Sequence, residues 1–273
     1  MTGFPRDFKI AFFDVDGTTV ITSEGFVRRP AAEALRRLQD TGLMMAIASG
    51  RPQVHLKELD KVMDASYKVT CNGNCVLDHQ GNVIRNRPIS AASFEALRRY
   101  AAEKDAGLAF HFLEQTYVYH GYDRIAAHYN TRTKEKTEVY KDLPSQDRHL
   151  NGTPYAYPYN AILAVDDDED LFRFVETLGD MRTDCPWPHM FDVFNKDVSK
   201  AKGIEAVLER ENLTWDDCIV FGDSTNDVEM LSKAGFGVCM GNGCDAAKEA
   251  ADYVCGRIEE DGLAGAIHDI FGI

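Results

Sequence analysis

The chain has 273 residues and a formal net charge of −14 at pH 7, because 44 acidic residues outnumber 30 basic ones. This balance, with no dense basic run, argues against a nucleic acid or an anionic membrane as the main partner. No apolar run approaches the roughly 20 residues that span a bilayer, and the first residues lack the basic and apolar regions of a signal peptide, so we expect a cytoplasmic protein.

The first predicted element is a buried strand that ends in two acids. Residues 10–13 form an unbroken apolar run, which is typical of a strand buried on both faces in a parallel sheet. Asp14 and Asp16 follow it, and residues two apart in an extended chain point to the same side. At this edge of a sheet, where ligands bind in open α/β folds, two acids favour a bound cation, a shared proton or both. The alternative is an Asp-Gly turn with solvated acids.

Strands and helices then alternate in the first third of the chain. The expected strands are 43–48, 67–71, 75–78 and 83–85, the last two joined as a hairpin. A helix is expected at 29–39, and Pro52 can begin a second one that runs to about residue 62. The order β-α-β-α-β predicts a parallel sheet with right-handed crossovers.

The middle of the chain has a different pattern. The expected helices are 90–104, 122–133 and 167–178, and the expected strands are 108–113, 117–120, 160–165, 181–184 and 190–194. The polar tract 134–158, with Arg148 and His149, contains little regular pattern. This order predicts a small α+β domain of roughly 100 residues, inserted as a cap.

After residue 195 the first pattern resumes. The expected helices are 199–210, 227–234 and 245–251, and the expected strands are 218–221, 237–240 and 253–255. We therefore predict an α/β protein with a Rossmann-like parallel-sheet core, residues 1–85 and 195–273, and an inserted α+β cap domain, residues 86–194.

Polar side chains also follow later strands of the predicted core. Ser49 offers a hydroxyl beside the expected start of a helix, which suits an anion, although Ser-Gly is also an ordinary helix cap. Lys200 lies near another helix start and can pair with a phosphoryl group; Lys202 is a rival for this role. Asp223 and Asp227 follow the strand 218–221 and suit a hard cation with oxygen ligands, or else form a helix cap.

Together these motifs resemble a known family. The order DVDGT (14–18), ASGR (48–51), a lysine before a helix, and GDSTND (222–227) is similar to the haloacid dehalogenase (HAD) superfamily of phosphatases. The size and position of the cap resemble the Cof-type subgroup. The resemblance implies a HAD-type core and a Mg²⁺-dependent phosphatase of small phosphorylated metabolites, with sugar phosphates as the expected class. It implies a monomer or small homo-oligomer whose partner is a small phosphate ester.

The resemblance also implies a role for each motif residue. Asp14 would be the nucleophile that becomes an aspartyl-phosphate, and Asp16 would be the general acid and base. Mg²⁺ would be bound by the side chains of Asp14 and Asp223 and the backbone carbonyl of Asp16, with Asp227 behind them. The residues expected to hold the phosphoryl group are Ser49, Gly50, Lys200 and Asn226. The candidate contacts to the rest of the substrate are Arg51 and Asn72.

Three other interpretations stay open. A phosphosugar mutase would use the same motifs, and a non-catalytic phosphosugar-binding regulator would bind esters without turnover. Gly241 begins a segment that matches the dinucleotide fingerprint GxGxxA, but only one short strand follows it, so a dinucleotide crevice cannot be completed.

In the cap, Tyr117, Tyr119 and His120 could contact substrate, but we expect them to be core residues of the cap sheet.

Overall fold

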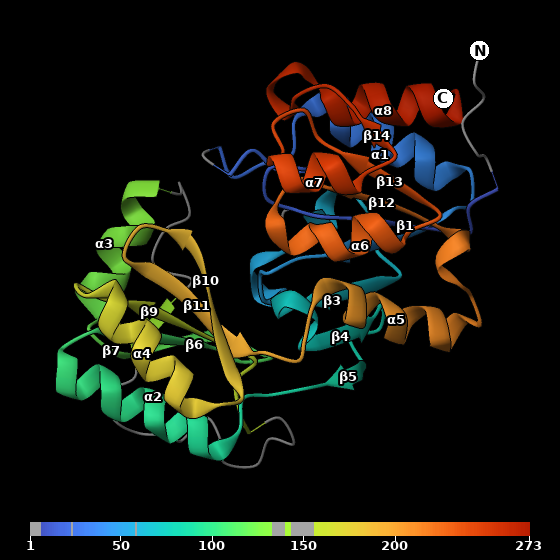
Figure 1. Ribbon diagram of the computed structural model, residues 1–273. Coiled ribbons are helices and arrows are strands. Elements are labelled where there is room, and N and C mark those ends of the chain that lie inside the picture. Colours follow the sequence, from blue (N-terminus) through green and yellow to red (C-terminus); the bar gives the residue numbers. More distant parts are fainter. Residues whose placement is uncertain (1–6, 23, 58, 133–139, 143–155) are drawn as a thin grey trace. The chain divides into compact units, whose positions relative to one another are not determined.

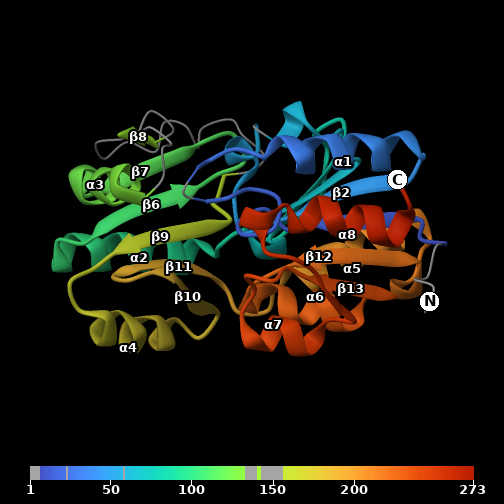
Figure 2. The ribbon, with the colours of Figure 1, turned by 90° about the horizontal axis from the view of Figure 1, so that it is seen from above.

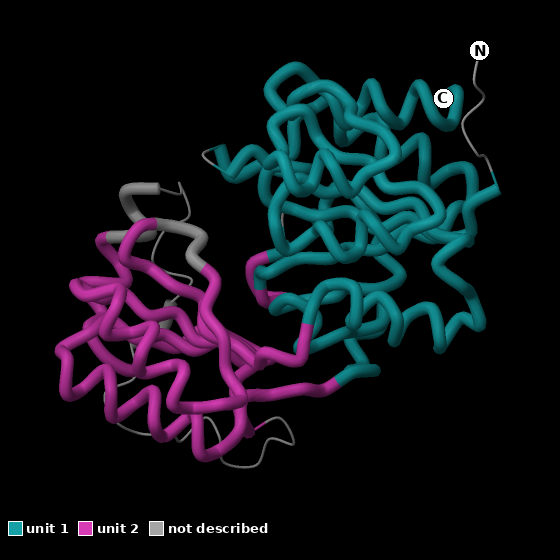
Figure 3. The backbone as a smooth tube through the Cα atoms, in the orientation of Figure 1, with its two compact units in different colours: residues 1–51, 56–85, 199–273 teal, residues 52–55, 86–198 magenta. Residues whose placement is uncertain are grey.

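The computed structural model describes residues 7–22, 24–57, 59–132, 140–142 and 156–273. The chain forms two compact units, residues 1–51, 56–85 and 199–273 in the first and residues 52–55 and 86–198 in the second (Figure 3). These bounds differ from the predicted domain bounds at residues 52–55 and 195–198, which belong to the second unit. The assignment of 86–194 as a cap domain stays a prediction.

The first unit is built on an eight-stranded sheet (Figure 1). Its strands, in spatial order, are β14 (Tyr253–Val254), β13 (Phe236–Cys239), β12 (Cys218–Gly222), β1 (Ile10–Phe13), β2 (Met44–Ala48), β3 (Tyr67–Thr70), β4 (Cys75–Asp78) and β5 (Val83–Asn86). Neighbours from β14 to β3 are parallel, and β4 runs antiparallel to β3. The predicted parallel-sheet core is therefore confirmed.

Helices cover both faces of this sheet. On one face, α1 (Arg29–Asp40) and α8 (Gly262–Phe271) pack on side chains such as Ala11 and Phe13. On the other face, α5 (Lys200–Glu211), α6 (Val228–Lys233) and α7 (Asp245–Ala250) pack on Ile10 and Phe12. Successive side chains of a strand point to opposite faces, so the continuous apolar run of β1 supplies both layers. Each fully buried Phe or Ile side chain contributes about 1.5–3 kcal/mol.

The second unit is built on a separate sheet, which is antiparallel except for one pair (Figure 2). Its strands, in spatial order, are β10 (Met181–Trp187), β11 (Met190–Asn195), β9 (Asn160–Ala164), β6 (Gly107–His111), β7 (Thr116–His120) and β8 (Tyr140–Asp142). Helices α2 (Ala91–Lys104) and α4 (Asp168–Leu178) pack on one face, and α3 (Tyr122–Arg132) packs on the other. This is the α+β arrangement that the element order predicted.

The predicted helix over 52–62 is wrong. The described residues there form two short 3-10 turns, Gln53–His55 and Leu59–Lys61. His55 contacts Thr116 of the second unit, whereas the next residue, Leu56, is buried in the core of the first. The division between the two units falls after His55, and one 3-10 turn lies on each side of it.

Two elements were not predicted. The sequence reading stopped at the strand 253–255, but α8 follows it and buries Leu263, Ile267 and Ile270 in the core. The short strand β8 lies in the tract that was expected to be irregular, and Arg148 and His149 of that tract lie outside the described residues. Within the described part of the chain, no helix combines the length and apolar character needed to cross a membrane.

Candidate active site

The register of the central strands brings three motifs to one edge of the first unit's sheet. Phe13 of β1 lies opposite Ile47 of β2 on one side and Phe221 of β12 on the other. The residues that follow these three positions therefore leave the sheet together. They carry the motifs that begin at Asp14, Ser49 and Asp223, and the predicted convergence of these loops follows directly from the parallel topology.

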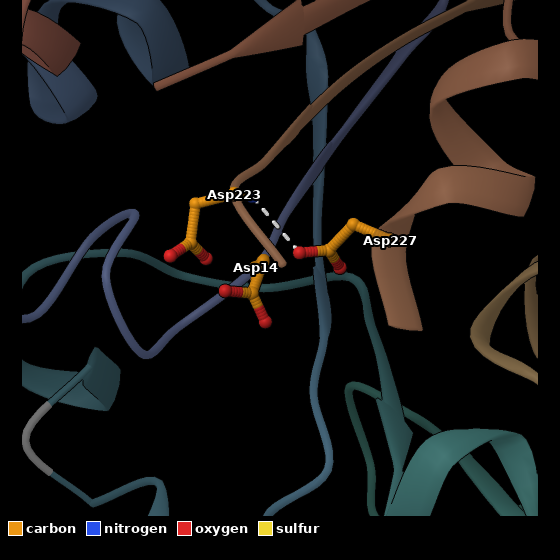
Figure 4. A group of neighbouring side chains, drawn as sticks. All are labelled: Asp14, Asp223 and Asp227. Atoms are coloured by element: carbon orange, nitrogen blue, oxygen red, sulfur yellow. Dashed lines mark hydrogen bonds between the residues drawn. The ribbon is translucent and has the colours of Figure 1, made fainter. Parts of the chain in front are cut away.

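Three carboxylates gather at this edge. Asp14, Asp223 and Asp227 each offer an oxygen atom, and these atoms all lie within 4.8 Å of one another (Figure 4). Asp14 and Asp227 are buried, and Asp223 is partly buried. The sequence interpretation requires Asp14, Asp16 and Asp223 to meet at one cation. The structure brings Asp14 and Asp223 together, whereas the third acid of the cluster is Asp227 and the Asp16 carboxylate is paired with Arg51.

Lys200 is the ammonium group that pairs with this cluster. It is 1% exposed, and its Nζ donates to Asp14 Oδ1 at 2.5 Å and to Asp227 Oδ1 at 2.6 Å. Burial alone would lower the pKa of Lys200, but the two carboxylates more than compensate and raise it, so the side chain stays charged. Lys202, the rival of the sequence interpretation, has an exposed side chain.

The cluster has a deficit of positive charge. Three carboxylates and one ammonium leave a formal charge of −2, and burial together with nearby Asp227 raises the pKa of Asp14 well above its usual range. The same two causes raise the pKa of Asp223 to about 6. A divalent cation with a preference for carboxylate oxygen, such as Mg²⁺, fits both the charge and the donor set.

Asp227 holds the other members of the cluster in place through hydrogen bonds. Its Oδ1 accepts from Lys200, and its Oδ2 accepts from the backbone N–H groups of Asp223 and Ser224, each at 2.9 Å. Both carboxylate oxygens are therefore already bonded. This favours the predicted supporting role of Asp227 and leaves Asp14 and Asp223 as the better direct ligands.

Gly17 is required by the close approach of the DVDGT loop to Asp223. It has a φ of +81°, and a Cβ placed on it would lie 2.2 Å from Asp223 Oδ2. Any other residue would combine a strained backbone with a clash against a carboxylate. Next to it, the Thr18 hydroxyl donates to Asp223 Oδ1 at 3.3 Å.

Asp16 is held by Arg51 and Thr22. The Arg51 guanidinium donates through Nε to Asp16 Oδ2 and through a terminal nitrogen to Oδ1, both at 2.8 Å, and the Thr22 hydroxyl donates to Oδ1 at 3.0 Å. Burial acts to raise the pKa of Asp16, but the charge and hydrogen bonds of Arg51 outweigh it and lower that pKa. Sequence reasoning proposed Arg51 as a substrate contact and missed this pair, because nothing in the sequence relates positions 16 and 51.

The other predicted phosphate-binding residues form a connected network. Ser49 Oγ accepts from the N–H of Arg51 at 3.1 Å, which leaves its hydroxyl proton available for another acceptor. The Asn226 side-chain NH₂ donates to Asn72 Oδ1 at 3.0 Å, and a Cβ on Gly50 would lie 3.4 Å from the Asn72 amide. Among the described residues that directly follow Ser49, 50–57 and 59–61, no α-helix begins, so the predicted helix N-terminus does not contribute to the predicted anion site. The roles of these residues stay predictions.

The aromatic hairpin of the second unit is a packing feature, as expected. Tyr117 and Tyr119 pack against the hydrophobic cluster that contains Phe94 and Phe110, and His120 Nδ1 lies 2.8 Å from the carbonyl oxygen of Ala106.

The segment that begins at Gly241 does not form a dinucleotide-binding site. Strand β14 lies at the edge of the first unit's sheet, and no strand follows it among residues 255–273. The second strand that a dinucleotide crevice needs after this segment is therefore missing from those residues.

Comparison with known proteins agrees with this geometry. Residues 11–267 match the family described as haloacid dehalogenase-like hydrolase. The 5-amino-6-(5-phospho-D-ribitylamino)uracil phosphatase YcsE of Bacillus subtilis is 24% identical over 96% of this chain and 95% of its own length. A Streptococcus pyogenes protein whose name pairs phosphatase with peptidyl-prolyl cis-trans isomerase is 24% identical, and the chain spans 54% of its length.

Solved structures share the fold over almost the whole chain. A hypothetical protein of Geobacillus kaustophilus is 28% identical with a TM-score of 0.85, covering 97% of this chain and 100% of that one. BT1666 from Bacteroides thetaiotaomicron, described among phosphatases of the HAD superfamily, is 25% identical with a TM-score of 0.81 over 97% and 95%. With the family match extending over nearly all of its residues, the chain belongs to the haloacid dehalogenase-like hydrolases, as its motifs predicted.

Proposed function

We propose that this hydrolase is a Mg²⁺-dependent phosphatase of small phosphorylated metabolites, with sugar phosphates as the substrate class, and that it works through an aspartyl-phosphate. One observation carries the proposal: a buried Asp14 bonded to Lys200, with Asp223 and Asp227 beside it and a formal charge of −2. A carboxylate can attack a phosphate dianion only where positive charge neutralises the pair, and this cluster has the oxygen ligands and the charge deficit to bind a divalent cation.

The residues divide the reaction into two displacements at one phosphorus. A carboxylate oxygen of Asp14 attacks the phosphorus, the bond to the ester oxygen breaks, and Asp16 gives a proton to the departing alcohol. This step requires Asp16 to be protonated, and therefore to leave the pair with Arg51 that lowers its pKa in this structure. Water then attacks the same phosphorus, Asp16 takes the proton of that water, and the bond to Asp14 breaks to release inorganic phosphate. Asp14 and Asp16 both return to their starting states.

Positioning and charge carry most of the rate in phosphoryl transfer, because there is little covalent chemistry for the protein to do. Lys200 contributes one positive charge at the Asp14 oxygen. Asp14 and Asp223 would hold Mg²⁺ through their side chains, with the carbonyl of Asp16, and the bound ion supplies further positive charge against the phosphoryl oxygens. Ser49 and Asn226 supply neutral donors at the same edge of the sheet.

The substrate class is supported by a relative. The Bacillus subtilis relative is named for a small phosphate ester whose phosphate sits on a ribityl chain, which is a sugar alcohol. The acidic balance of the whole chain also disfavours polyanionic macromolecules as substrates. We therefore propose free phosphorylated metabolites of modest charge as the partners of this site.

The test replaces the nucleophile. Asp14→Asn removes the attacking oxygen while keeping the side-chain size, so hydrolysis of 4-nitrophenyl phosphate in the presence of Mg²⁺ is expected to fall at least about 10³-fold, as for loss of an essential nucleophile. Asp166→Asn is the matched control, because the Asp166 carboxylate is exposed, lies in the second unit and pairs with Arg124. Retained activity in a folded Asp14→Asn variant contradicts the nucleophile assignment.

The same assay separates a phosphatase from a mutase. A phosphatase releases one inorganic phosphate for each sugar phosphate consumed, whereas a mutase returns the phosphoryl group to a sugar. Chelation of Mg²⁺ with EDTA is expected to stop turnover, and added Mg²⁺ is expected to restore it. Full activity in EDTA would contradict the metal requirement while leaving the Asp14 result intact.

A further inference from the structure

Asn242 connects two loops of the first unit, and the proposed function leaves it without a role. It lies in the segment 240–244, directly after β13. Its Nδ2 donates to the carbonyl oxygen of Gly17 at 2.8 Å, and its Oδ1 accepts from the N–H of Ile258 at 2.9 Å. Both ends of the amide are bonded, so the side chain has one orientation and holds the Gly17 backbone at a defined distance from the Ile258 loop.

The position of Gly17 matters because its backbone touches an acid of the cluster. A Cβ on Gly17 would lie 2.2 Å from Asp223 Oδ2, so the Gly17 Cα is in close contact with this carboxylate. Gly17 also follows Asp16, whose carbonyl oxygen is one of the proposed Mg²⁺ ligands. A displacement of the Gly17 backbone would therefore change the position of two ligand groups at once.

The segment that carries Asn242 contacts Asp223 as well. The N–H of Cys244 donates to the carbonyl oxygen of Asp223 at 2.8 Å. A Cβ on Gly243 would lie 2.9 Å from that oxygen, so only glycine permits this approach. Residues 240–244 thus touch both loops that supply the acids, one through Asn242 and the other through the Cys244 backbone.

We propose that Asn242 is a positioning residue for the metal site: by holding the Gly17 carbonyl, it sets the separation between the Gly17 backbone and the Asp223 carboxylate, and so the affinity for Mg²⁺. The inference rests on the proposed function, because it takes Mg²⁺ to be the cation at Asp14 and Asp223. Groups that orient metal ligands without touching the metal typically change its affinity by about 10–100-fold.

The experiment measures Mg²⁺ binding directly on the purified full chain. Asn242→Leu keeps the size of the side chain and removes both hydrogen bonds; Mg²⁺ affinity is followed by isothermal titration calorimetry and by the rise in Tm on adding Mg²⁺. We expect the Kd for Mg²⁺ to increase about 10-fold or more. Asn82→Leu is the matched control, because Asn82 also bonds a turn of the first unit, at Asp78, but contacts none of the acids of the cluster.

The possible outcomes separate a failure of the Asn242 inference from a failure of the proposed Mg²⁺ requirement. An unchanged Kd in a folded Asn242→Leu variant, even with a lower Tm, shows a purely structural role and overturns the inference. Absence of Mg²⁺ binding in the unmodified chain overturns the metal requirement itself. If Asn242→Leu does not fold, Asn242→Ala is measured in the same way, since it also removes both hydrogen bonds, and an unchanged Kd there overturns the inference equally.

Discussion

The two units differ in the polar groups that they bury. In the first unit these groups include charged ones: Asp14, Lys200 and Asp227 sit together with a net negative charge, in addition to neutral residues such as Ser49 and Asn72. In the second unit the described buried polar side chains are all neutral. His111 is 3% exposed, and burial lowers its pKa to about 3, so it is uncharged near neutral pH.

This difference shows whether the buried polar groups of each unit are satisfied within the protein. In the second unit the Thr116 hydroxyl lies 2.8 Å from His111 Nδ1 and 3.3 Å from His55 Nε2, and it can donate to one ring and accept from the other. Such a group is satisfied within the protein and needs no ligand. The first unit keeps an unbalanced negative charge, which a divalent cation would offset in the proposed phosphoryl transfer.

The largest expected effect comes from removing the charge that holds the first unit's cluster together. Lys200→Met leaves Asp14 and Asp227 buried without their ammonium partner, which typically costs about 3–5 kcal/mol of stability. It also removes a positive charge from the Asp14 oxygen that is proposed to react, so activity is expected to fall about 10²–10³-fold. Urea unfolding and phosphate release measure the two effects.

Measuring the stability of Lys200→Met at several Mg²⁺ concentrations extends this test. Because the variant cluster has a larger charge deficit, its free energy of unfolding should depend more strongly on Mg²⁺ than that of the unmodified chain. Full activity and unchanged stability in Lys200→Met would show that Lys200 is not part of the reacting cluster. Lys202→Met is the control, because its side chain is exposed, and it should leave both quantities nearly unchanged.

A second prediction concerns pH and the second unit. The folded state holds His111 with a pKa of about 3, below the ordinary value of 6.5, so the unfolded chain binds the extra proton between these values. Stability is therefore fully present above about pH 6.5 and is lost as the pH falls toward 3, by about 3 kcal/mol at pH 4. Hydrogen exchange of β6 and β7 between pH 4 and pH 7 measures this loss.

His111→Gln is the matched variant, because glutamine can hydrogen-bond but does not titrate in this range. The difference in unfolding free energy between the two proteins should shrink as the pH falls, since only the histidine must be protonated on unfolding. A parallel pH dependence in the two proteins would show that His111 is not the group responsible, whatever the acids of the first unit contribute.

The smallest effect tests whether the neutral network matters at all. Thr116→Val keeps the shape of the side chain and removes the hydroxyl that lies between the two histidine rings, which is expected to cost about 1–3 kcal/mol because a buried partner loses its hydrogen bond. Thermal unfolding measures it. Thr177→Val on α4 is the control, and it should change stability by less, because the Thr177 hydroxyl is exposed and donates to the carbonyl oxygen of Phe174 in the same helix.

Much of the active site was predictable because its residues are ordered by the sheet. Asp14 and Asp223 are far apart in sequence, yet each follows a strand of the parallel sheet, and parallel strands end at one edge, so their convergence was predictable. Lys200 begins helix α5 instead, and its approach to Asp14 was expected only from the family resemblance. The pairing of Arg51 with Asp16 was missed, because which donor a side chain reaches depends on the path of two loops and not on any pattern in either.

The amino-acid sequence by itself determined the alternation of elements and the parallel core, since periodicity and turn residues act locally along the chain, and it supplied the acids proposed to react. Only the tertiary structure decided where residues 52–62 would pack, which lysine is buried, and that Asn242 holds Gly17. The physical reason is that burial and side-chain hydrogen bonds form between segments distant in sequence. Their energies outweigh the local preference for a helix that residues 52–62 express.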